Sequence, residues 1–171
     1  MLITLCFTGQ AAETAQLMID IDRWVMKSAA KAMLEKRKEG KDIRFFIKLS
    51  NDSLEDPTLL PWISKLLTAA RIHGSSFVFE VSEASALNNL KATKSLSSGL
   101  HQLNCLFALD HVGNDNPSLK YLSHFDVNFL KIDGAHIKNL TSSEASQELV
   151  KGITELARGK DILTIAEHVQ D

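Results

Sequence analysis

The sequence has few cysteines, no long apolar run and a nearly balanced charge. Its two cysteines, Cys6 and Cys105, each lie in a short apolar run, which is typical of a reduced core residue. The apolar opening from Met1 to Phe7 lacks a basic flank and is too short to cross a membrane. We therefore expect a cytoplasmic protein with no membrane segment.

The charge and the absence of repeats narrow the classes of function. A formal net charge of -2 argues against a DNA- or RNA-binding surface spread over the molecule. The sequence shows no internal repeat, low-complexity tract or linker, and its apolar fraction of 44% is ordinary for a globular protein. We expect one domain, or most of one, with small ligands and protein partners as the remaining classes.

The sequence does contain five short apolar runs that each end on a charged residue. An unpaired charge at the end of a buried strand must be solvated, paired or used in a site. The runs alternate with helix-like segments, which predicts a parallel α/β sheet with a site at the carboxyl ends of its strands. The predicted strands are 44–49, 76–81, 105–110, 127–133 and 161–166, and the charged ends are Lys48, Glu80, Asp110, Lys131 and Glu167.

Apolar spacing and capping residues predict the helices between these strands. Gly40 is expected in the left-handed conformation after the longest helix. Trp24, Trp62 and the phenylalanines fall on apolar positions and are predicted to be core. Ser97 to Gly99 is expected to end a helix. The predicted helices are about 11–18, 21–38, 57–73, 82–96 and 145–157.

Five segments in order carry a resemblance to a known family. They are Asp20-Ile-Asp-Arg-Trp-Val25 and the four strand ends Glu80-Val-Ser-Glu83, Asp110-His-Val-Gly113, Leu130-Lys-Ile-Asp133 and Ala166-Glu-His-Val-Gln170. The first is similar to a helix, and the strand ends resemble the patterns E-hydrophobic-T-E, D-D-F-G, L-K-I-D and A-E-G-V-E, of the EAL domain family of bacterial cyclic di-GMP phosphodiesterases.

The resemblance implies a (β/α) TIM-barrel-like fold that is incomplete in this chain. A complete barrel takes about 250 residues, whereas about five strands are predicted here. The E-A-L strand and a final glutamine-bearing strand have no counterpart. Residues 1–171 are therefore expected to form a single, partial EAL-like domain, with a FimX-like, degenerate character.

The resemblance also assigns roles to residues. Active relatives hold divalent cations with carboxylates that Glu80 and Asp110 match, and they place catalytic groups at the positions of Lys131 and Glu167. Glu83 matches a residue that steadies a loop over the metals. In this chain Lys48 replaces an asparagine ligand and His111 replaces the second aspartate, so we interpret the metal positions as vestigial.

These replacements indicate a catalytically inactive cyclic di-GMP receptor, as in relatives resembling the pilus regulator FimX. The expected ligand contacts are Lys48, Glu80, Asp110, His111 and Lys131, with Lys48 as a built-in counter-ion for the carboxylates. Internal salt bridges, between Lys48 or Lys131 and the carboxylates, are the structural alternative for the same residues.

Two other hypotheses for the function stay open. One is a protein-docking domain that binds no nucleotide, and the other is residual phosphodiesterase activity in a longer, full-length protein. No cofactor is expected, except Mg²⁺ or Mn²⁺ if activity survives. Binding of the nucleotide to these 171 residues is expected to be weak. A regulatory protein partner is also expected, and open sheet edges could pair with a second copy to give a homodimer.

Overall fold

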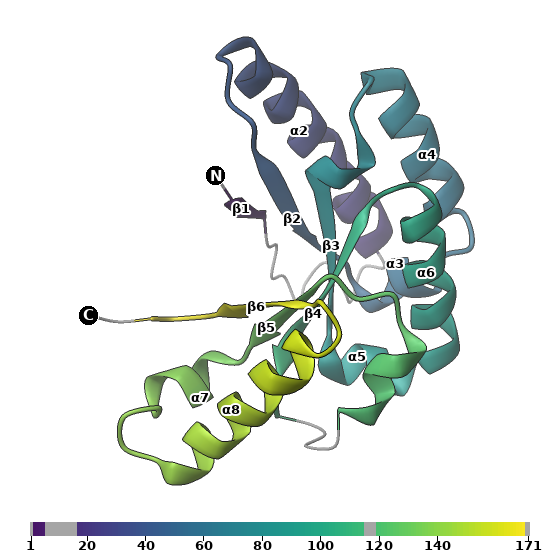
Figure 1. Ribbon diagram of the computed structural model, residues 1–171. Coiled ribbons are helices and arrows are strands. Elements are labelled where there is room, and N and C mark those ends of the chain that lie inside the picture. The colour runs from purple at the N-terminus through teal and green to yellow at the C-terminus, as the bar shows by residue number, and fades with distance from the viewer. Residues whose placement is uncertain (1, 6–16, 115–118, 170–171) are drawn as a thin grey trace. The chain divides into compact units, whose positions relative to one another are not determined.

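The computed structural model describes residues 2–5, 17–114 and 119–169, with the backbone alone for residues 2–5. The described part of the chain alternates strands and helices (Figure 1). Its strands are β1 (Leu2–Leu5), β2 (Arg44–Lys48), β3 (Phe77–Ser82), β4 (Leu106–Val112), β5 (Phe129–Ile132) and β6 (Leu163–Ala166). Its α-helices are α2 (Met18–Lys38), α3 (Asn51–Glu55), α4 (Leu59–Ala70), α5 (Glu83–Asn88), α6 (Leu90–Gln102), α7 (Gly134–Lys138) and α8 (Glu144–Arg158), and its 3₁₀ turns are η1 (Gly74–Ser76) and η2 (Lys120–His124).

The chain divides into two compact units. The first unit comprises Met1–Glu80 and Ser98–Leu106, and the second comprises Val81–Ser97 and Phe107–Asp171. In the first unit β1 pairs with β2 and β2 with β3, and in the second β4 pairs with β5 and β5 with β6. All four pairings are parallel, which confirms the predicted α/β fold class.

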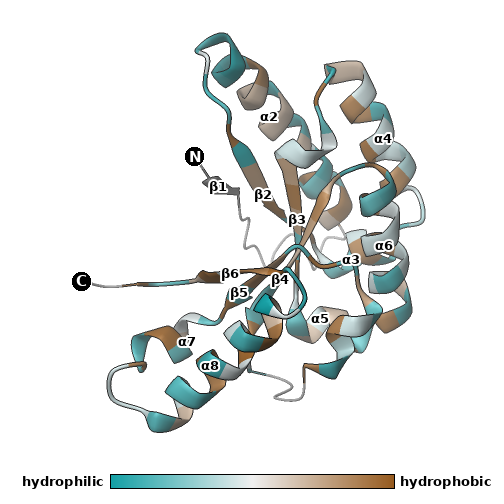
Figure 2. Ribbon diagram, in the orientation of Figure 1, coloured by the Kyte–Doolittle hydropathy of each residue, from teal (hydrophilic) through white to brown (hydrophobic). Residues whose placement is uncertain are grey.

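The core of each unit is built from its strands. Phe46, Phe77 and Phe79 are almost fully buried in the first unit, and Phe107 and Leu109 in the second. Figure 2 shows the strands as mainly hydrophobic and the helices as mixed. Helix α2 packs against β2, and α8 against α7 and β6. Strands buried in this way read as continuous apolar runs, which is why the sequence revealed them.

The prediction that Trp24 belongs to the core is wrong, because its side chain is 65% exposed. The buried face of α2 instead includes Asp22, whose carboxylate accepts hydrogen bonds from the backbone N–H and the hydroxyl of Ser50, at 2.8 and 2.7 Å. These bonds compensate the burial of the charge, and the buried face of α2 differs from the face that hydrophobicity alone predicts. Trp62 is partly buried, and the charged groups of Arg23 and Lys27 lie 5.7 and 5.8 Å from its ring centre.

The helix boundaries confirm some expectations and correct others. Helix α8 matches its prediction, and Gly40 has a φ of +71°. Ser97 to Gly99 do not end a helix, because α6 continues through them to Gln102. The Ser97 hydroxyl donates to the Lys94 carbonyl, and the side chain of Leu60 fills the space where a Cβ of Gly99 would lie. Gly99 was therefore predicted to end the helix, whereas it lies within the helix and leaves room for the Leu60 side chain.

Two further helix predictions differ from the described elements or lie outside them. The region predicted as one helix from 57 to 73 holds only α4, which starts at Leu59 and is preceded by the short α3. The predicted helix at 11–18 and the residue Cys6 lie largely or wholly outside the described residues. None of the helices in the described residues is both long and apolar enough to span a bilayer.

Candidate functional site

The charged ends of β4 and β5 meet at a β-bulge in the second unit. Leu109 pairs with Leu130 and Val112 with Ile132, so β4 has two residues, Asp110 and His111, where β5 has one. His111 has a φ of +57°, in the left-handed region. A bulge of this kind changes the direction of the side chains that follow it. Consecutive residues that would point to opposite faces of a regular strand therefore both reach the same group of charges.

Lys131 of β5 lies at the centre of this group. Its ammonium nitrogen is 2.8 Å from Oε1 of Glu167 and 3.3 Å from Oδ1 of Asp110, and its side chain is only 8% exposed. Asp110 is buried as well, and Glu167 follows directly after β6. One ammonium group is thus shared between two carboxylates. The internal ion pair is therefore present at this position.

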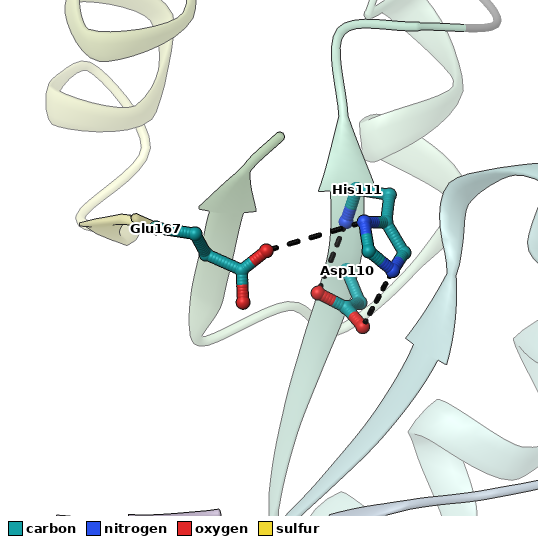
Figure 3. A group of neighbouring side chains, drawn as sticks. All are labelled: Asp110, His111 and Glu167. Atoms are coloured by element: carbon teal, nitrogen blue, oxygen red, sulfur yellow. Dashed lines mark hydrogen bonds and ion pairs between the residues drawn. The ribbon is translucent and has the colours of Figure 1, made fainter. Parts of the chain in front are cut away.

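His111 contacts the same carboxylates from the bulge (Figure 3). Its Nε2 lies 3.4 Å from Oδ2 of Asp110, and its Nδ1 lies 3.0 Å from Oδ2 of Asp133 and 4.0 Å from Oε2 of Glu167. The imidazole is 45% exposed, unlike the Lys131 ammonium. The second unit thus gathers three carboxylates around one lysine and one histidine, and the histidine is the member that solvent reaches most easily.

Asp133 has a structural role besides its contact with His111. It is the N-cap of α7, where its Oδ1 accepts a hydrogen bond of 2.8 Å from the backbone N–H of Ala135. Burial tends to raise the pKa of Asp133, but the hydrogen bonds from Ala135 and His111 outweigh it and lower the pKa below the usual value of 3.8. This carboxylate therefore stays ionised and fixes the orientation of the imidazole.

Glu83 is buried and accepts hydrogen bonds from residues that lie after β4. Its Oε2 accepts a hydrogen bond of 3.0 Å from the backbone N–H of Gly113, and its Oε1 accepts one from the hydroxyl of Tyr121. These partners lie on either side of residues 115–118, which are outside the described residues. The sequence pointed to Glu83, whereas Tyr121 carried no signal of its own. The loop-stabilising role of Glu83 stays a prediction.

In the first unit, Lys48 and Glu80 are register partners at the ends of β2 and β3. Glu80 is almost completely buried and Lys48 partly buried. The segment after Lys48 is fixed by Asp22 through the hydrogen bonds to Ser50, which in turn caps α3. Register alone thus brings this ammonium and this carboxylate to the ends of adjacent strands. Their proposed contact with a ligand stays a prediction.

The donor atoms of the second unit do not fit a two-magnesium centre. Asp110, His111 and Glu167 each offer one potential ligand atom, and these atoms lie within 4.8 Å of one another. Magnesium prefers oxygen ligands only, whereas this set includes an imidazole. No chemical step through metal ions follows from this arrangement.

Comparison with known proteins places these strand ends in a family. A profile of the EAL domain matches residues 8–171. The chain belongs to the EAL domain family. It is 34% identical over 151 residues to the cyclic di-GMP phosphodiesterase PdeF of Escherichia coli, in an alignment that covers 88% of this chain and 20% of PdeF. The chain therefore spans about a fifth of that relative.

Solved EAL structures share the fold. The FimX EAL domain of Pseudomonas aeruginosa bound to c-di-GMP superposes with a TM-score of 0.86 at 37% identity, covering 94% of this chain and 64% of that one. The Xanthomonas citri FimX EAL domain in complex with c-di-GMP gives a TM-score of 0.87 at 28% identity, covering 94% and 63%. Both comparisons confirm the EAL fold, and both structures extend beyond the length of this chain.

Proposed function

We propose that this chain is part of a cyclic di-GMP receptor that does not hydrolyse the nucleotide. The observation that carries the proposal is the His111 imidazole, whose Nε2 lies 3.4 Å from Oδ2 of Asp110. It stands where the family has an aspartate and reduces the suitability of the cluster for magnesium. The Lys131 ammonium, at a position that active relatives share, lies 3.3 Å from Asp110 and 2.8 Å from Glu167 and offsets charges that would otherwise repel a phosphodiester. The similarity to two FimX EAL domains bound to c-di-GMP supports the choice of ligand.

Each predicted site residue has a role in this proposal. Lys131 and His111 contact the phosphates from β5 and from the β4 bulge. Lys48 supplies a further cation, and Glu80 and Asp110 are vestigial metal positions, of which Asp110 pairs with the Lys131 ammonium. Lys131 and Glu167 occupy catalytic positions of the family without catalysing turnover. Glu83 holds the segment after β4 in place. The proposal retains the predicted cytoplasmic location.

A titration of the natural full-length protein tests the proposal. Calorimetry with cyclic di-GMP should show saturable binding of equal affinity in excess EDTA and in millimolar Mg²⁺. Lys131→Ala should weaken binding at least tenfold, because a hydrogen bond to a charged group contributes about 1.5–3 kcal/mol. Lys138→Ala removes an exposed positive charge from α7 in the same unit and should leave the affinity unchanged. Binding that requires Mg²⁺ would contradict the proposal.

A residual phosphodiesterase is the second candidate. The 34% identity to PdeF, a named phosphodiesterase, favours it. The second candidate predicts Mg²⁺- or Mn²⁺-dependent cleavage of cyclic di-GMP by the full-length protein, which the receptor proposal excludes. A flat titration on a folded sample would instead leave a protein-docking role, with a regulatory partner or a second copy of the chain.

A further inference from the structure

The first unit contains a hollow that the proposed nucleotide site does not use. The hollow has a volume of about 610 Å³ and lies between the carboxyl-terminal ends of α4 and α6, beside the segment that leads into β3. Its volume is within the range of small-molecule sites. It borders the start of β3, whereas Glu80 lies near the end of that strand. The hollow thus lies away from the strand ends that carry the charged residues, which favours a binding site over a catalytic one.

The lining of the hollow combines an apolar base with hydrogen-bond donors. Leu67 and Ile72 are at most 8% exposed and contribute the apolar part. The exposed polar part includes Arg71, Gln102 and Asn104, and no carboxylate contributes to the lining. The side chains of these three polar residues form no hydrogen bond or ion pair with the part of the chain that the structure describes. Their donors are thus available to a ligand.

Arg71 is the residue that gives the hollow its charge. It is the C-cap of α4 and has a φ of +51°, a position where glycine is the usual residue. A positive charge there could merely complement the helix dipole. However, the guanidinium of Arg37 already donates to the carbonyl of Arg71 at 3.3 Å. A cation therefore already lies beside the end of α4, and the Arg71 guanidinium adds a second positive charge at the hollow.

The wall of the hollow is held by close backbone packing. Gly74 precedes β3, and a Cβ at this position would overlap the carbonyl oxygen of Leu103 and the backbone of Asn104. Glycine thus lets the segment after α4 lie directly against the end of α6. Asn104 also has a positive φ, of 56°. The polar groups are consequently displayed by constrained backbone, which reduces the entropy cost of binding.

We propose that this hollow binds a small anionic ligand, with a carboxylate or phosphate group attached to an apolar body. The Arg71 guanidinium would bind the anionic group in a bidentate manner. Gln102 and Asn104 would donate further hydrogen bonds, and the apolar body would cover Leu67 and Ile72. The inference is independent of the proposed nucleotide function, because none of these residues belongs to the charged cluster.

The experiment titrates the whole chain with benzoate and with phenyl phosphate. NMR chemical shifts of the backbone amides report binding. Saturable shifts at residues 71–75 and 102–104, with dissociation constants on the order of 1 mM, would support the proposal. Benzyl alcohol is the neutral control and inorganic phosphate the control without an apolar body. Equal binding of either control, or no saturable shift with either probe, would overturn it. Comparing the two probes distinguishes a carboxylate ligand from a phosphate ligand.

Arg71→Gly separates lost binding from lost folding. Glycine suits the left-handed conformation at position 71, so the melting temperature should rise or stay the same. Probe affinity should fall about ten- to a hundredfold, the loss expected for hydrogen bonds to a charged group. Lys65→Ala removes an exposed charge from the same helix, outside the hollow, and should leave the affinity unchanged. Equal affinity of Arg71→Gly and the wild type would overturn the proposal.

Discussion

Two buried carboxylates of the second unit, Glu83 and Asp110, have different kinds of partner. Glu83 accepts hydrogen bonds from a backbone N–H and a tyrosine hydroxyl, both neutral. Asp110 lies beside the Lys131 ammonium and the His111 imidazole. Neutral donors fix a segment of chain without changing the charge of the site, whereas a protein cation also sets what charge a ligand meets. Within one unit, Glu83 is thus held by neutral donors, whereas Asp110 belongs to the charged cluster that we propose as a ligand site.

The largest effect should come from Lys131→Met. Removal of the ammonium leaves the carboxylates of Asp110 and Glu167 close together at low exposure, which should lower the free energy of unfolding by about 3 kcal/mol. Urea unfolding at pH 7 measures this loss. Adding Asp110→Asn should recover part of it, because one of the two uncompensated charges disappears. Lys138→Met, on an exposed position of α7, should change stability by less than about 0.5 kcal/mol.

Glu83→Ala should have a slightly smaller effect, of about 2–3 kcal/mol. It leaves the N–H of Gly113 and the hydroxyl of Tyr121 without their acceptor in a buried place. Hydrogen exchange should also become faster at Gly113. The control is Glu148→Ala on the exposed part of α8. If both variants lose the same small amount of stability, Glu83 is not an anchor and the comparison with Asp110 fails.

The sequence predicted the fold more completely than the site. Apolar runs located β2 to β6 to within a few residues, and β2 to β5 are largely buried strands of the kind that form continuous apolar segments, whereas β6 is largely exposed. It also indicated Lys131 and Asp110 as neighbours, because parallel strands end at one edge. In a regular strand the side chains of Asp110 and His111 would point to opposite faces of the sheet. No local sequence pattern predicted the bulge that brings them together. The only hint is residue type, since histidine occurs more often than most residues at positive φ.

Other errors arose where a polar contact replaced an apolar one. The helical face of α2 was assigned from hydrophobicity, which placed Trp24 inside and left Asp22 without a role. Asp22 is buried because Ser50, 28 residues away, supplies two hydrogen bonds. Tyr121 was missed for a similar reason, since its partner Glu83 lies 38 residues away. Single partners at this sequence separation leave no periodic signal.

Asp133→Ala should reduce stability by about 1 kcal/mol at pH 7, through loss of the α7 cap. The pKa of Asp133 is lowered in the folded protein, so its contribution is complete above the unfolded value near 3.8 and is lost as pH falls through the folded value. The gap between wild type and variant should therefore narrow below about pH 4. Urea titrations from pH 7 to pH 3 measure it. A gap that widens in acid would contradict the assignment.

The smallest effect should come from His111→Ala. The imidazole is 45% exposed, so its contacts with Asp110 and Asp133 are largely screened and stability should change by less than about 0.5 kcal/mol. Nucleotide affinity should fall nevertheless if His111 contacts a phosphate. Urea unfolding of the variant and the wild type measures the change in stability, and calorimetric titration with cyclic di-GMP measures the change in affinity. A large loss of stability would place His111 with Glu83 among the structural residues and remove it from the proposed ligand site.

The most direct test of the receptor proposal is a turnover assay on the natural full-length protein. The protein is incubated with cyclic di-GMP and millimolar Mg²⁺ or Mn²⁺, and the nucleotides are separated by anion-exchange chromatography. The proposal predicts that cyclic di-GMP is recovered intact while calorimetry on the same sample shows binding. Metal-dependent accumulation of the linear dinucleotide would contradict it.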